Sequence, residues 1–221
     1  FWKALLGKSI YRKISYLSAE DTRRLVTEPL CGVVSYPGEV VDSIYRLSGG
    51  HPFYAQVICQ NLVDLLMEED RDDPSTTDLE KVVKDIVENP LPQMIYSWNS
   101  LSDWNKFTLS ALAGVISGSR QAADTAAAYR YLTASKIALP FKRERLNVFL
   151  EEAYQKELLE KNDSGDYRFR MDLYRRWVRK EHSIWKVIKE VNLEVRKKRV
   201  LLRWALPGAA ALVVGVLLFL I

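Results

Sequence analysis

Apolar residues recur at helical spacing through most of the first hundred positions. One stripe runs from Val40 to Ile44 and another from Phe53 to Leu66. Ser18 precedes a further helical segment and has Asp21 three residues later, the spacing of a capping box. The expected helices cover 18–28, 39–47, 53–66 and 76–89. We therefore expect a helical bundle over residues 18–98.

Three further helical stripes and an alternating segment follow in the zone 99–182. The stripes cover 103–112, 121–132 and 142–158. After a turn at 162–165, Tyr167 and Phe169 alternate with arginines, which indicates the second strand of a hairpin. Three helices followed by a hairpin are typical of a winged-helix domain.

The last segment of the chain predicts a membrane anchor. Residues 204–221 contain no charged side chain, and about 20 apolar residues suffice for a helix to cross a bilayer. Basic and aromatic residues precede this run, and we expect them at the membrane interface: Arg196, Lys197, Lys198, Arg199, Arg203 and Trp204. The positive-inside rule then places residues 1–199 on the cytoplasmic side. A stalk helix over 183–203 is expected to lead into the span, and His182 and Ser183 offer a point where it can break.

Charge is distributed unevenly along the chain. Residues 1–102 hold 10 basic and 15 acidic side chains, residues 103–182 hold 15 and 11, and residues 183–221 hold 7 and 2. The net charge of +4 over 221 residues is too small to indicate a nucleic-acid partner by itself. The candidate recognition helix over 142–161 has five side chains of each sign, which opposes binding to phosphates of DNA. Nucleic acid is therefore a disfavoured partner.

The predicted wing and the helix after it are more basic than the recognition helix. Their cationic residues are Arg168, Arg170, Arg175, Arg176, Arg179 and Lys180. These side chains could face DNA, anionic lipid, an acidic partner domain or solvent. The sequence alone leaves these four environments open.

Few side chains suit metal or nucleophilic chemistry. Cys31, Cys59, His51 and His182 stand at unrelated spacings, so we expect neither a zinc site nor a disulfide framework. The chain has no Gly-x-x-x-x-Gly-Lys-Ser/Thr loop that could cradle nucleotide phosphates. We expect no catalytic residue in these 221 residues, and any ATPase activity would belong to a longer parent chain.

One tripeptide in the helical zone carries a family resemblance. Two glycines end the helix over 39–47, and Gly50-His51-Pro52 places a proline in the first turn of the next helix. With Phe53-Tyr-Ala-Gln56 and the upstream Leu17-Ser-x-Glu-Asp-x-x-x-Leu25, this segment resembles the helical lid of STAND-type AAA+ ATPases and its Gly-x-Pro motif. The run from Tyr167 to Val178 is similar to the end of the winged helix in the same proteins.

The resemblance implies that Gly50, His51 and Pro52 form the lid side of a pocket for ATP or ADP, with the proline packed on the adenine. The phosphates and magnesium would be held mainly by a core domain upstream of Phe1, and residues 1–17 would be its end. The chain would then be the regulatory part of a membrane-anchored signalling ATPase. In it, a nucleotide-sensing lid is coupled through the winged helix to the membrane.

The expected fold is thus mainly α: a helical lid bundle, a winged-helix domain with one small β-hairpin, a long stalk helix and a transmembrane helix. The expected partners are nucleotide and membrane lipid. Ala211 and Gly215 have the spacing of a small-residue pair in a span, which favours self-association. Two other functions stay open, namely a membrane-anchored winged-helix DNA-binding regulator and a tail-anchored protein-interaction scaffold.

Overall fold

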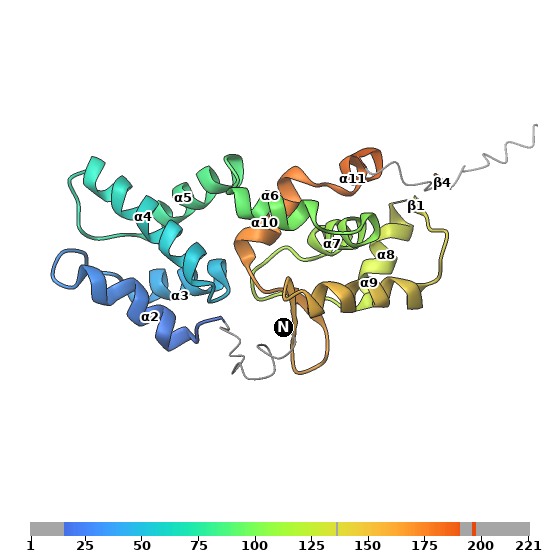
Figure 1. Cartoon of the computed structure of the whole chain (residues 1–221), viewed down its shortest axis with the longest axis horizontal. Helices are drawn as coiled ribbons and strands as arrows, with labels where there is room; N and C mark the ends of the chain where they lie inside the picture. The colour runs from blue at the N-terminus through green and yellow to red at the C-terminus, as the bar shows by residue number, and fades with distance from the viewer. Residues whose placement is uncertain (1–15, 136, 191–195, 198–221) are drawn as a thin grey trace, which may run out of the picture.

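The computed structural model describes residues 16–135, 137–190 and 196–197. This part of the chain is mainly helical, with ten α-helices, one short 3-10 helix and two antiparallel strand pairs. Two groups of helices lie next to each other along the long axis of the molecule (Figure 1). Almost all of the predicted end of a core domain, over 1–17, lies outside the described residues.

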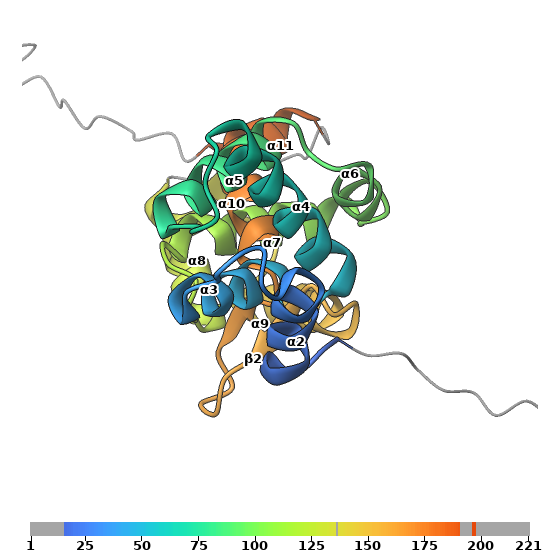
Figure 2. The ribbon, with the colours of Figure 1, turned by 90° about the vertical axis from the view of Figure 1, so that its left-hand side faces the viewer.

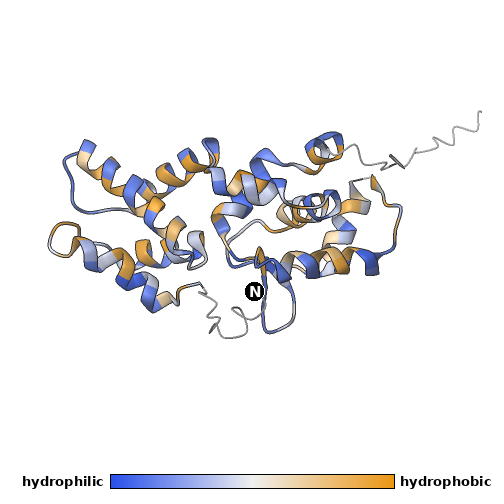
Figure 3. Cartoon of the chain, in the orientation of Figure 1, coloured by the Kyte–Doolittle hydropathy of each residue, from blue (hydrophilic) through white to orange (hydrophobic). Residues whose placement is uncertain are grey.

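The first group is the helical bundle that the apolar pattern predicts. It consists of α2 (Ala19–Thr27), the 3-10 helix η1 (Glu28–Leu30), α3 (Gly38–Ser48), α4 (Pro52–Glu68) and α5 (Thr76–Glu88). The Ser18 hydroxyl accepts a hydrogen bond from the Asp21 N–H at 3.0 Å, and Ser75 with Asp78 forms a capping box at α5. The apolar sides of these helices, orange in Figure 3, pack together around residues such as Ile58.

The second group contains three helices followed by a β-hairpin, the order on which the winged-helix prediction is based. Its elements are α6 (Pro92–Asn99), α7 (Asp103–Val115), α8 (Thr125–Ala134), α9 (Arg143–Gln155), β2 (Leu159–Lys161) and β3 (Tyr167–Phe169). Helices α7, α8 and α9 contact one another, and α9 also packs on β2. Strands β2 and β3 are antiparallel, and Ala123, just before α8, forms a further bridge to Tyr167. The hairpin thus gains a short third segment from the chain just before α8.

Helix α10 (Asp172–Glu181) joins the two groups. It contacts α3 and α5 of the first group and α7 of the second. In the end-on view of Figure 2 it lies in the middle of the molecule, with helices of both groups around it. Tyr174, Trp177 and Val178 are buried in a hydrophobic cluster that extends through both groups. Because one core serves both, the two groups of helices pack directly against each other.

The predicted stalk helix over 183–203 is not continuous where the structure describes it, because Arg196 and Lys197 form a strand. Helix α11 (Ile184–Glu190) has only seven residues and is separate from α10, because His182 between them has a non-helical backbone (φ −123°, ψ 54°). The His182 ring stacks on Trp98 with the ring centroids 4.1 Å apart, and its carbonyl oxygen accepts a hydrogen bond from the Ser110 hydroxyl. These contacts with other helices fix the chain in the break that the sequence only permitted.

The basic collar is also not helical where the structure describes it. Arg196 and Lys197 form β4, which pairs in antiparallel fashion with β1 (Ile137–Ala138). The other four predicted interface residues, Lys198, Arg199, Arg203 and Trp204, lie outside the described residues. Backbone pairing with β1 therefore replaces the continuous helix that we expected at this point.

The predicted single-pass membrane architecture needs correction as well. Within the described ranges, no helix is both long enough and apolar enough to cross a bilayer. The longest, α4, has 17 residues and carries Asp64 and Glu68, whereas a span needs about 20 apolar residues. The predicted span over 204–221 lies outside the described residues. The structure thus overturns the predicted fold class with its transmembrane helix and the predicted membrane location, and supports a mainly helical fold with small two-stranded sheets.

Candidate functional site

The Gly-His-Pro segment forms a tight turn between α3 and α4. Gly49 (φ 59°) and Gly50 (φ 77°) both adopt left-handed backbone conformations, which end α3 and reverse the chain. His51 is the N-cap of α4, and Pro52 is its first residue, where the missing N–H of proline costs no hydrogen bond. The local structure is thus the one that the sequence pattern predicts.

The two glycines also bring three chain segments into close approach. A Cβ atom on Gly50 would lie 2.3 Å from the Leu17 carbonyl oxygen, and a Cβ on Gly49 would lie 2.4 Å from the Arg170 carbonyl oxygen. The Leu17 N–H donates to the Gly50 carbonyl at 2.8 Å. The turn therefore touches the entry to the lid on one side and the end of β3 in the winged helix on the other.

His51 is enclosed by aromatic rings beside this turn. Its ring is edge-on to Tyr16 and to Tyr54, with centroid distances of 5.5 and 5.0 Å. Its Nδ1 atom is buried and has no hydrogen-bond partner among the described residues. Burial lowers the pKa of His51 below its ordinary value of 6.5, so the neutral imidazole is favoured at pH 7. His51 therefore contributes a neutral polar atom next to apolar surface.

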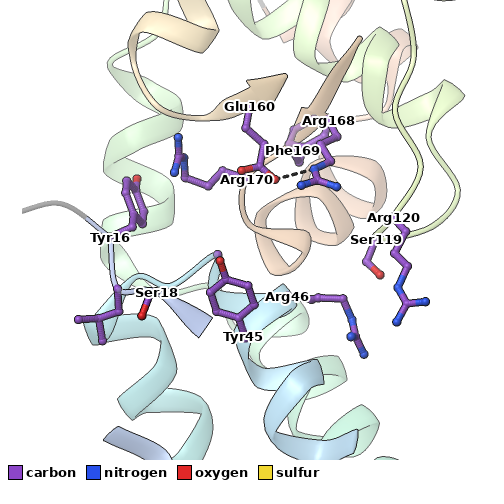
Figure 4. A pocket seen from close by; sticks show the side chains of 12 residues that line it. Tyr16, Ser18, Tyr45, Arg46, Ser119, Arg120, Glu160, Arg168, Phe169 and Arg170 are labelled. Atoms are coloured by element: carbon purple, nitrogen blue, oxygen red, sulfur yellow. Dashed lines mark hydrogen bonds and ion pairs between the residues drawn. The ribbon is translucent and has the colours of Figure 1, made fainter. Parts of the chain in front are cut away.

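A cavity of about 320 Å³ opens beside the turn, between the first and the second group of helices (Figure 4). We call it the central cavity. Four arginines line it, and they come from both groups of helices: Arg46, Arg120, Arg168 and Arg170. One carboxylate, that of Glu160, is also in the lining. Tyr16 and Gly49 reach the cavity, whereas Gly50, His51 and Pro52 do not line it.

The arginines of the central cavity are only partly neutralised. Arg168 pairs with Glu160 at 2.6 Å, and Arg46 donates to the Ser43 hydroxyl at 2.8 Å. The Arg170 guanidinium lies over the Tyr16 ring, 4.5 Å from its centroid, and its Nε atom is buried without a hydrogen-bond partner among the described residues.

These side chains give the central cavity a positively charged lining. Figure 4 shows Arg46 and Arg120 on one side of the cavity and Arg170 with Tyr16 on the other. None of the described carboxylates forms an ion pair with Arg46, Arg120 or Arg170. Guanidinium groups bind phosphate and carboxylate in bidentate geometry, so an anionic ligand fits this cavity.

Sequence reasoning found the turn but missed most of the cavity. Arg46 precedes the glycines by one helical turn, and Arg120 is in the loop after α7, so nothing in their spacing links them. Arg168 and Arg170 were expected only as part of a basic surface. Their alternation with the buried Tyr167 and Phe169 is the one signal that distinguishes them, because it places Arg168 on the opposite face of β3, with Arg170 directly after the strand.

The basic residues of α10 face an acidic neighbour within the same chain. The Arg176 guanidinium donates to both carboxylate oxygens of Glu80, and Lys180 pairs with Glu88 at 2.9 Å. Of the environments left open by the sequence, an acidic neighbour is the one found for these two side chains, and it is α5 of the first group of helices.

The predicted recognition helix, α9, is poorly suited to bind nucleic acid. Near the start of α9, the exposed side chains of Arg143, Glu144 and Arg145 alternate in sign. Arg145 lies over the Phe149 ring, 5.3 Å from its centroid. A groove-reading helix needs several cations facing phosphates, and this face carries a carboxylate among them.

Metal binding and family membership gain no support. Among the described residues, no group of three or more His, Cys, Asp or Glu side chains could hold a metal ion. No known protein family matches the chain, and no curated protein compared with it is significantly similar. The resemblance to STAND-type ATPases thus depends on the residues of the turn and of the winged-helix end alone.

Proposed function

We propose that the chain is the regulatory part of an ATP- or ADP-responsive switch, a helical lid coupled to a winged helix, similar to that of STAND-type ATPases. The nucleotide would bind at the Gly-His-Pro turn and the central cavity, together with a phosphate-binding core that is not among these residues. Magnesium would be held mainly by that core. The function proposed is therefore nucleotide sensing rather than catalysis.

The observation that carries this proposal is the position of the turn beside the arginines. Gly49 touches the Arg170 backbone and lines the cavity, and Pro52 begins α4 three residues further on. A nucleotide has an apolar base and an anionic phosphate chain. The aromatic surroundings of His51 suit the base, and the unpaired guanidinium groups suit the phosphates.

The same arrangement supplies a mechanism for switching. Arg46 belongs to the lid bundle, whereas Arg168 and Arg170 belong to the winged helix. A phosphate that contacts arginines from both sides stabilises the packed arrangement of the two groups. A ligand shifts a conformational equilibrium only through different contacts in the two states, and nucleotides with different phosphate chains meet this condition.

The proposal is tested by ADP binding to the intact protein, measured by isothermal titration calorimetry. We expect Arg170→Gln to weaken ADP binding about tenfold or more, since a hydrogen bond to a charged group is worth about 1.5–3 kcal/mol. Pro52→Ala should weaken it as well. Gly50 is a poor test position, because any side chain there collides with Leu17 whether or not nucleotide binds.

Lys189→Gln is the matched control, because Lys189 is exposed on α11 and lines neither the turn nor the cavity. The control should bind ADP like the wild type. If Arg170→Gln and Pro52→Ala also bind ADP with wild-type affinity, the nucleotide-sensing proposal is wrong, and a protein-interaction scaffold becomes the better reading.

A further inference from the structure

A second basic concavity lies on the other side of the loop after α7. It is an open groove of about 630 Å³, which we call the α10 groove. Its lining consists of the loop residues Ser117, Gly118 and Ser119 and the α10 residues Arg175, Arg176, Arg179 and Lys180. Ser119 also lines the central cavity, so one loop borders both concavities.

The floor of the groove is rigidly built. Arg175 is 5 % exposed, and its guanidinium binds the Asp172 carboxylate at 2.6 Å and the Ile116 carbonyl at 3.1 Å. This second bond ties the start of the loop to α10. Ser117 is held in turn, because both its N–H and its hydroxyl donate to the Gln121 side-chain oxygen. The groove is therefore a preformed concavity.

Two of the three cations at the rim, Arg179 and Lys180, are held weakly or not at all. Arg176 and Lys180 pair with Glu80 and Glu88, whose side chains are 59 % and 45 % exposed, and pairs of this kind contribute little because water and salt screen them. Arg179 is exposed and forms no ion pair with any described residue. Arg179 and Lys180 thus border the groove without a strong internal anion, whereas Arg176 also pairs with the buried Asp172 carboxylate at 2.8 Å.

We propose that the α10 groove binds a small phosphate-bearing anion, which displaces Glu80 and Glu88 from Arg176 and Lys180. A phosphate group presents several strong acceptor oxygens, so it can contact Arg176, Arg179 and Lys180 at once, whereas each carboxylate holds only one of them. The Ser119 hydroxyl at the opposite rim, which has no hydrogen bond to the described residues, is a further donor.

Binding there would weaken the contact between the lid bundle and the winged helix. The pairs Arg176–Glu80 and Lys180–Glu88 are the ion pairs described between α10 and α5. An anion that takes over the two cations leaves Glu80 and Glu88 facing solvent. The α10 groove would thus act in the opposite sense to the central cavity, where an anion draws the two groups together.

Titration of the intact protein with pyrophosphate at constant ionic strength tests the proposal. We expect saturable binding that Arg179→Gln weakens about tenfold, while Lys156→Gln, which removes an exposed charge from the end of α9, has no effect. The double variant Glu80→Gln/Glu88→Gln removes the internal competitors and should bind about threefold to tenfold more tightly. Far-UV circular dichroism checks that each variant is folded.

The Arg170→Gln variant separates this site from the central cavity. Pyrophosphate binding at the α10 groove should survive that substitution, whether or not ADP binding does. If pyrophosphate does not bind, or if Arg170→Gln abolishes its binding while Arg179→Gln leaves it unchanged, the proposal is overturned. If Glu80→Gln/Glu88→Gln binds pyrophosphate with wild-type affinity, the anion does not compete with the carboxylates of Glu80 and Glu88.

Discussion

The central cavity and the α10 groove are both lined by arginines, but these arginines differ in whether a carboxylate of the same chain pairs with them. In the central cavity, Arg168 pairs with Glu160, while Arg46, Arg120 and Arg170 have no carboxylate partner among the described residues. In the α10 groove, by contrast, the cations mostly have one. Asp172 binds Arg175 and Arg176, and carboxylates of α5 bind Arg176 and Lys180.

This difference separates a buried and paired arginine that stabilises the fold, Arg175, from an arginine that is available to a ligand, Arg170. Arg175 is buried with a partner, and a buried charge without a partner is costly. Arg170 is only partly buried, and its cation lies on a tyrosine ring, which stabilises it less than a carboxylate would. A basic run in a sequence can therefore contain structural and ligand-binding arginines side by side, as it does between Arg168 and Lys180.

Of the substitutions that test this comparison, Asp172→Ala should have the largest effect on the stability of the protein. The carboxylate is 3 % exposed and holds both Arg175 and Arg176, so its loss leaves the Arg175 guanidinium buried with only the Ile116 carbonyl. We expect the free energy of unfolding to fall by about 3–5 kcal/mol, the usual cost of breaking a buried ion pair. Urea denaturation of the wild type and the variant measures it.

The double variant Asp172→Ala/Arg175→Leu is the control for that experiment. Removing both partners leaves no unpaired buried charge, and such replacements are often close to neutral. We expect the double variant to regain most of the lost stability. If it is as unstable as Asp172→Ala alone, the ion pair is not what stabilises the base of the groove.

A smaller loss of stability is expected from Gly49→Ala, which acts on the wall of the central cavity. The new Cβ would lie 2.4 Å from the Arg170 carbonyl oxygen in a residue with φ 59°. Left-handed backbone in a non-glycine residue costs about 1–3 kcal/mol, and here the collision is with another backbone segment. The variant should therefore both lower the unfolding free energy and shift Arg170, which weakens ADP binding.

Gly118→Ala gives the matched comparison in the α10 groove. No atom lies within 4 Å of a Cβ placed there, and Gly118 has no positive φ. The unfolding free energy should change by no more than about 0.5 kcal/mol, as for most surface substitutions. If Gly49→Ala and Gly118→Ala change the unfolding free energy equally, the close approach of Gly49 to the Arg170 backbone does not limit which residue can stand at position 49.

Local patterns of the sequence predicted most of the helices, although not α6, and also the glycine turn and the hairpin. The stripe from Val40 to Ile44 lies on α3, and the stripe from Phe53 to Leu66 lies on α4. The alternation of Tyr167 and Phe169 is that of β3. These features depend on residues close together in the chain, so periodicity and turn chemistry are enough to find them.

Contacts between distant segments decided the features that sequence reasoning missed or misjudged. The break at His182, which the sequence permitted but did not require, is held by Trp98 and Ser110. The strand at Arg196–Lys197, which the sequence did not predict, depends on β1, more than 50 residues earlier. The central cavity likewise unites segments around Arg46, Arg120 and Arg170. No local pattern predicts these contacts between distant segments, because they follow from how the two groups of helices pack around α10.

Hydrogen–deuterium exchange of the intact protein with and without ADP tests most directly whether nucleotide binds at the junction of lid and winged helix. We predict that ADP slows backbone exchange in peptides that cover 45–54 and 167–170, the two sides of the central cavity. Exchange in α11, which touches neither the turn nor the cavity, should stay unchanged. Exchange that ADP leaves unaltered in both cavity segments, while the protein binds ADP elsewhere, would contradict the account.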